Sequence, residues 1–153
     1  MFRKTELFLK KWKESSNKKA LLITGARQIG KTYLVRHFGK ANYENFVEIN
    51  FITNPSAINI FSGDLSADTI IMNLTAFLGK KLVPGKTLIF FDEIQECPNA
   101  RTAIKFLVED GRFDYIESGS LLGVNYIPWK NSISLLSAVN LTTAFLKLAV
   151  LPS

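Results

Sequence analysis

One stretch of the sequence decides the fold: Gly25-Ala26-Arg27-Gln28-Ile29-Gly30-Lys31-Thr32. It is a complete GxxxxGK(S/T) phosphate-binding loop, in which backbone N–H groups turn inward onto phosphate oxygens. In this pattern Lys31 reaches the β- and γ-phosphates, and the Thr32 hydroxyl ligates Mg²⁺. We therefore expect all eight residues to bind a nucleotide, Lys31 to act in catalysis as well, and Thr32 to be a metal ligand.

The residues on either side of this loop predict a strand before it and a helix after it. Residues 20–24 are an apolar run typical of a buried strand, and the spacing of Leu34, Val35 and Phe38 predicts a helix that ends near Gly39. The N-terminus of that helix would direct its dipole at the phosphates. This context makes a chance match to the loop pattern less likely.

A second motif begins at residues 87–91, an apolar, strand-like run that ends in the adjacent carboxylates Asp92 and Glu93. It has the form of a Walker B segment, and parallel strands deliver such side chains to the ligand at their carboxyl ends. We expect Asp92 to hold the Mg²⁺ shell through water, and Glu93 to deprotonate the attacking water as a general base. The alternative is a solvated turn, which the phosphate-binding loop disfavours.

The remaining elements alternate between helix and strand patterns. We expect an amphipathic basic helix within residues 1–19, a strand at 45–51 closed by Pro55, a helix over residues 67–82 ending near Gly79, a helix over 98–111 and a strand at 113–117. This order predicts an α/β fold, the three-layer α/β/α plan of P-loop NTPases, with a mainly parallel sheet.

Polar residues at two predicted strand ends are further site candidates. Ser118 or Ser120, after the fourth strand, could hydrogen-bond the γ-phosphate or the attacking water. Asn50, at the end of the second strand, has two readings: it holds Glu93 away from water until a partner binds, or it forms a strand-end turn.

The formal net charge of +6 is unevenly distributed. Residues 1–20 hold seven Lys/Arg against two Glu, whereas residues 21–124 are close to neutral. We favour a solvated helix face over a nucleic-acid or membrane patch. The single Cys97, charges inside the first residues and the polar interruptions in residues 135–151 predict a cytoplasmic protein without a membrane span.

With these motifs in hand, the chain resembles a prokaryotic group of predicted ATPases in the AAA+ superfamily, whose phosphate loop reads GxRQxGKT. It is similar also in Asp92-Glu93-Ile94-Gln95, in Cys97-Pro98-Asn99-Ala100-Arg101, in Phe106-Leu107-Val108-Glu109-Asp110-Gly111-Arg112 and in Ser118-Gly119-Ser120-Leu121-Leu122-Gly123. The resemblance covers residues 1–126 and implies ATP and Mg²⁺ as cofactors, with hydrolysis driven by Glu93. It also implies a homo-oligomer or protein partner, and a C-terminal domain like restriction endonucleases in longer members.

The resemblance ends near Tyr126, and residues 127–153 contain no acidic residue. A fifth strand beyond the phosphate-loop strand, a lid and an arginine for a neighbouring site cannot be identified there, so we expect a truncated or frame-shifted copy with a partial core at 20–126. Two functions follow: an ATPase, or an ATP-binding module with negligible hydrolysis. A kinase and a GTPase are disfavoured. Arg27 could touch a phosphate, a neighbouring subunit or a surface carboxylate.

Overall fold

A computed structural model describes residues 2–25, 28, 30–120 and 146–150. Its elements, in chain order, are α1 (Phe2–Glu14), β1 (Leu21–Gly25), α2 (Lys31–Asn42), β2 (Asn45–Asn50), the 3₁₀ helix η1 (Pro55–Phe61), α3 (Ala67–Leu78), β3 (Thr87–Asp92), the 3₁₀ turn η2 (Ile94–Glu96), α4 (Pro98–Asp110), β4 (Asp114–Ser120) and β5 (Leu146–Val150). The helix and strand alternation predicted from the sequence is confirmed.

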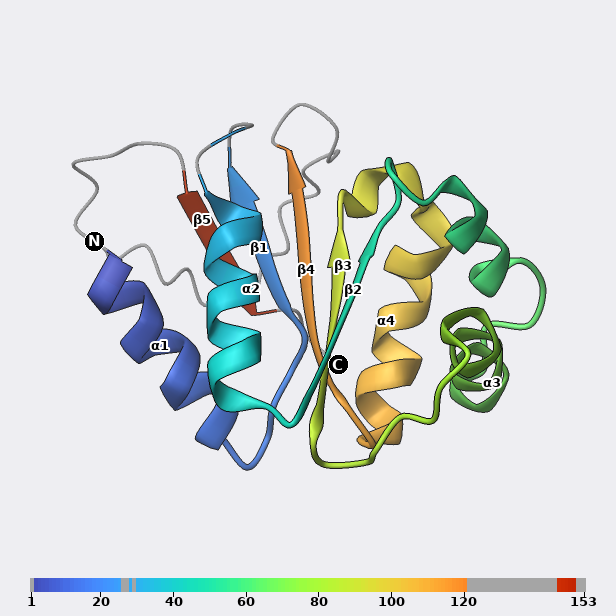
Figure 1. The fold of residues 1–153 in the computed structure, drawn as a ribbon, viewed down its shortest axis with the longest axis horizontal. Helices are drawn as coiled ribbons and strands as arrows, with labels where there is room; N and C mark the ends of the chain where they lie inside the picture. Colours follow the sequence, from blue (N-terminus) through green and yellow to red (C-terminus); the bar gives the residue numbers. More distant parts are fainter. Residues whose placement is uncertain (1, 26–27, 29, 121–145, 151–153) are drawn as a thin grey trace.

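The strands form one sheet in the order β2-β3-β4-β1-β5. The pairs β2–β3, β3–β4 and β4–β1 are parallel, and β5 runs antiparallel to β1. Helices α1 and α2 cover one face of this sheet, and α3 and α4 cover the other (Figure 1). The predicted three-layer α/β/α fold with a mainly parallel sheet is therefore confirmed.

Two hydrophobic cores lie on the two faces of the sheet. In β3, which is buried throughout, Leu88 and Phe90 join the core beneath α1 and α2. Ile89 and Phe91 alternate with them and join the core beneath α3 and α4. Because side chains of a strand alternate between faces, a continuous apolar run is what a strand covered on both sides requires.

The expectation that no C-terminal strand can be found was wrong. Strand β5 pairs with the outer edge of β1, with Leu21 opposite Val150 and Gly25 opposite Leu146. Without β5, this edge of β1 would carry unpaired backbone N–H and C=O groups, and a short extended segment can satisfy them. The composition of the tail did not predict this strand, because it forms by pairing with β1, which is distant in the sequence. The rest of the tail, residues 127–145 and 151–153, lies outside the described residues.

Two predicted boundaries also moved. Gly39 lies inside α2, which continues to Asn42. A Cβ atom at position 39 would lie 2.3 Å from a ring carbon of Phe46, so this glycine lets α2 approach β2 rather than ending the helix. Strand β4 extends through Ser118 to Ser120, because both residues pair with β1, and this pairing overrides the turn preference of Ser-Gly-Ser.

Candidate nucleotide-binding site

The phosphate-binding loop leads from the end of β1 into the first turn of α2. Gly30, the residue before the helix, has φ of 86° and carries no side chain that could cap the first-turn N–H groups. The left-handed conformation favours glycine at this position. Gln28 also has a positive φ, of 62°. The helix thus presents its N-terminal amides and the positive end of its dipole to an anion.

Lys31 lies inside the loop that it terminates. Its side chain is largely buried, with 6% of its surface exposed, and its ammonium donates a hydrogen bond to the Gly25 carbonyl over 3.1 Å. The lysine therefore joins the two ends of the loop. Ala26, Arg27 and Ile29 lie outside the described residues, so the side-chain roles expected of them stay predictions.

Asp92 is the best-connected side chain of the site. Its carboxylate is 2% exposed and accepts hydrogen bonds from the Thr32 hydroxyl over 2.8 Å and from the Asn50 amide over 3.1 Å. The Ser118 hydroxyl and the Glu93 backbone N–H donate to its other oxygen. A buried carboxylate requires such donors, because burying an unpartnered charge is costly.

These groups meet because parallel strands end at one edge of the sheet. Asn50 and Asp92 are register partners at the ends of β2 and β3, and Ser120 is the register partner of Gly25 at the end of β1. The parallel strands β1 to β4 therefore bring their carboxyl ends to the same edge, from which α2 begins (Figure 1). This edge is where open α/β sheets bind ligands.

Asn50 contacts Asp92, whereas one sequence reading placed it against Glu93. Its side-chain oxygen accepts hydrogen bonds from the backbone N–H groups of Ile52 and Thr53, both over 3.0 Å. The residue thus forms the turn after β2, which is the other reading. Its amide reaches Asp92 because the two residues face each other across the β2–β3 register.

Glu93 lies just beyond β3 in a left-handed conformation, with φ of 57° and ψ of 47°. Its carboxylate accepts a hydrogen bond from the Gln95 side-chain amide over 2.5 Å. We did not select Gln95 from the sequence, although it belongs to the Asp92-Glu93-Ile94-Gln95 run that carries the resemblance. A contact across one turn has no signature in hydrophobic periodicity.

Ser118 and Ser120 are both buried and both point to the α2 side of the sheet, two residues apart along β4. Ser118 donates to Asp92, so in this structure its partner is the carboxylate. Contact of either serine with a phosphate or water stays a prediction.

A second buried carboxylate, that of Glu117, also lies on β4. Neither of its oxygens has a hydrogen-bond partner among the described residues, and the Arg101 guanidinium lies 3.9 Å from one of them. Complete burial raises the pKa of Glu117 to about 8, and Arg101 offsets only part of that shift. We did not single out Glu117 from the sequence. The signal that could have identified it as a buried carboxylate was its place in a central strand that is buried on both faces.

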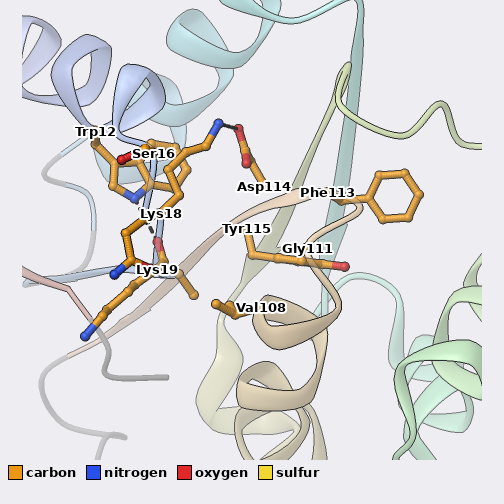
Figure 2. Close-up of a pocket in the computed structure, with 11 residues that line it drawn as sticks. Trp12, Ser16, Lys18, Lys19, Val108, Gly111, Phe113, Asp114 and Tyr115 are labelled. Atoms are coloured by element: carbon orange, nitrogen blue, oxygen red, sulfur yellow. Dashed lines mark hydrogen bonds and ion pairs between the residues drawn. The ribbon is translucent and has the colours of Figure 1, made fainter.

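A pocket of about 210 Å³ lies at the opposite edge of the sheet. It is formed by the connection from α1 to β1 and by the turn from α4 into β4. The Lys18 ammonium donates to a carboxylate oxygen of Asp114 over 3.0 Å, and Figure 2 shows the lysine side chain extended towards Asp114. Ala20 precedes β1, and Asp114 opens β4, so the pocket lies at the amino ends of these strands. It is therefore separate from the nucleotide site.

Neither a cluster of metal ligands nor a membrane-spanning helix is found in the described residues. Within the described residues, no three His, Cys, Asp or Glu side chains are grouped so that they could hold a metal ion. Among the helices of the same residues, none combines the length and the apolar character needed to cross a bilayer.

Fold and site together define a nucleotide-binding protein with a phosphate-binding loop. Comparison with family profiles then gives the group: a profile described as "AAA domain" matches residues 17–127. The chain belongs to this family, and it is a nucleotide-binding module of the AAA type. No curated protein matched the sequence.

Proposed function

We propose that this protein binds ATP with Mg²⁺ and hydrolyses it, with Glu93 as the general base. One observation carries the proposal: the Thr32 hydroxyl lies 2.8 Å from the buried Asp92 carboxylate, immediately before Glu93. A phosphate loop hydroxyl and a strand-end carboxylate in contact are what a nucleotide-bound Mg²⁺ needs on its protein side. The family match to an AAA domain supports the same reading.

The residues present fit Mg²⁺. Thr32 and Asp92 supply hard oxygen atoms, and Asp92 is held in place by its four donors. Magnesium binds proteins through one or two oxygen side chains together with phosphates and waters, so a cluster of three acidic residues is not required. Thr32 would bind the ion directly and Asp92 through water, and the ion would neutralise charge on the phosphates.

Residues 25–32 would hold the phosphates. The open N-terminus of α2 offers backbone amides, and Lys31 would exchange its hydrogen bond to the Gly25 carbonyl for oxygens of the β- and γ-phosphates. This exchange costs little, because one partner of the ammonium replaces another and the new one is charged.

Hydrolysis would follow by in-line attack. The water oxygen forms a bond to the γ-phosphorus while the bond from that phosphorus to the β–γ bridging oxygen breaks, and the bond electrons leave with ADP. Glu93 takes the proton of the water. Ser118 and Ser120 would orient the water or the γ-phosphate, and Asn50 would support Asp92.

A second candidate function is an ATP-binding module with negligible turnover. The observation that favours it is that residues 127–153 contain no arginine, so none of them can supply the cation that an arginine adds to the transition state of phosphoryl transfer. The two functions predict equal nucleotide affinity and different rates of phosphate release.

Two variants test the proposal. MgATP should raise the melting temperature of the wild type, and Lys31→Ala should abolish that shift, because it removes the cation that contacts the phosphates. Glu93→Gln should keep the shift and lower phosphate release at least about 100-fold. Lys40→Ala, an exposed residue of the same helix, serves as the control. A thermal shift that persists in Lys31→Ala would contradict the binding site, and equal rates for wild type and Glu93→Gln would contradict the general base.

A further inference from the structure

Gln95 lies within the turn η2, two residues after Glu93. Its side-chain nitrogen Nε2 donates a hydrogen bond to Oε2 of Glu93 over 2.5 Å. A carboxylate that acts as a base needs a fixed orientation and one oxygen free to receive a proton. This contact leaves Oε1 of Glu93 for that task.

The backbone that carries the two side chains is firmly held. The N–H of Glu96 donates to the Glu93 carbonyl over 3.0 Å, and the N–H of Cys97 donates to the Ile94 carbonyl over 3.1 Å. Ile94 and Cys97 are both 1% exposed and anchor the turn in the core beneath α4. Gln95 is thus mounted on a short, rigid segment, so its amide can restrict the rotamers of Glu93.

The other end of the Gln95 amide is poorly satisfied. Its oxygen Oε1 is buried and has no hydrogen-bond partner in the described part of the chain. An unsatisfied buried acceptor is destabilising, and an apolar side chain of the same length would avoid that cost. Stability alone therefore does not explain a glutamine at this position.

We propose that Gln95 is a positioning residue for ATP hydrolysis. Its amide holds Oε2 of Glu93, so that Oε1 of Glu93 faces the attacking water. This inference rests on the proposed function of Glu93 as the general base. It assigns to Gln95 a role in turnover and none in nucleotide affinity, because its amide donates to Glu93, the proposed base.

The variant Gln95→Met tests this directly, since methionine has the same length and no N–H donor. We expect the affinity for MgATP to stay within about twofold of the wild type, and kcat to fall about tenfold or more, because misplacing a catalytic group by about 1 Å can cost 100-fold. The melting temperature should stay equal or rise by about 1–4 °C, because the unsatisfied oxygen is gone.

Two further variants sharpen the measurement. In a Glu93→Gln background, Gln95→Met should lower kcat no further, because the two residues act as one unit. Glu96→Gln is the matched control, since Glu96 lies in the same turn and is exposed, and it should leave kcat and affinity within about twofold.

Each contrary result has its own meaning. Wild-type turnover in Gln95→Met would overturn the assignment of Gln95 alone. A loss of turnover accompanied by a melting temperature more than about 5 °C lower would overturn it as well, because the residue would then be structural. A wild type that binds MgATP without releasing phosphate would overturn the proposed hydrolysis, and the role of Gln95 with it.

Discussion

At the residue scale, the sheet holds two buried carboxylates in opposite situations. Asp92 accepts hydrogen bonds from four donors at the ligand-binding edge of the sheet. Glu117 has none in the described residues and lies 3.9 Å from Arg101. Burial without hydrogen-bond donors favours the protonated form of a carboxyl group and raises the pKa of Glu117. The two carboxyl groups therefore differ in their surroundings: donors fix the orientation of Asp92 at the edge where the phosphate loop lies, whereas Glu117 lies in the sheet without such donors among the described residues.

The pKa of Glu117 makes a prediction about stability. Because burial raises that pKa to about 8 from its ordinary value of 4.5, the folded state prefers the protonated form. The stability that this preference contributes is fully present below pH 4.5 and is lost as the pH rises through about 8. Glu117→Gln cannot ionise, so the variant should gain on the wild type as the pH rises from 5 to 8.5, by a few kcal/mol at about 1.4 kcal/mol per pKa unit.

Urea unfolding at pH 5 and pH 8.5 measures this difference. Glu109→Gln is the matched control, since Glu109 is an exposed residue on α4, and its effect should be the same at both pH values. An equal difference between Glu117→Gln and the wild type at the two pH values would contradict the raised pKa.

At the element scale, local signals predicted which segments form helices and strands, and contacts between elements decided where some of them end. Helix α3 ends at Gly79, as the sequence predicted, because a glycine end signal acts within the helix itself. The structure adds the cap at its start, where the Ser66 side chain accepts a hydrogen bond from the Thr69 N–H. Gly39 looked like another helix end, yet α2 continues past it. A glycine is needed at position 39 because the ring of Phe46 on the neighbouring strand leaves no space for a side chain, and a local sequence pattern cannot reveal that contact.

The approach of α2 to β2 predicts the effect of Gly39→Ala. Alanine has the higher helix propensity, by about 1 kcal/mol, so an exposed glycine at this position would be stabilised by the change. Here the new Cβ would lie 2.3 Å from the half-buried Phe46 ring, which stacks on Phe90, so the ring has to shift. We expect a net loss of about 1–3 kcal/mol in the free energy of unfolding, as for other overpacked cores.

Chemical denaturation of Gly39→Ala, with Lys40→Ala as an exposed neighbour for comparison, measures this cost. In a Phe46→Ala background the same substitution should become neutral or stabilising, because the clash is gone. A Gly39→Ala variant as stable as the wild type would mean that the ring yields without cost.

At the scale of the whole molecule, one sheet separates two hydrophobic cores and places the residues of the nucleotide site at one of its edges. The core beneath α1 and α2 contains Ile23 and Ile116, and the core beneath α3 and α4 contains Ile104. The ligand edge belongs to neither core, since it is built from the polar residues that follow or end the strands. The apolar residues inside each strand thus pack the cores, and the polar residues at the strand ends form the nucleotide site.

This separation predicts that substitutions in different cores act independently. Ile23→Val and Ile104→Val should each cost about 0.5–1.5 kcal/mol, and the double variant should lose the sum within about 0.5 kcal/mol. Ile23→Val combined with Ile116→Val, within one core, should deviate more. Denaturant unfolding of the single and double variants checks this, and strong coupling across the sheet would contradict it.

The sequence by itself determined the phosphate-binding loop, the Asp92-Glu93 strand end and the alternation of elements that makes the fold. These features are written in short motifs and in periodicities of 2 and 3.6 residues, which depend on near neighbours alone. Only the tertiary structure decided that Asn50 donates to Asp92, that Glu117 is buried without a hydrogen-bond partner among the described residues, and that β5 pairs with β1. Those outcomes depend on strand register, burial and pairing between segments far apart in the chain, and no local pattern encodes them.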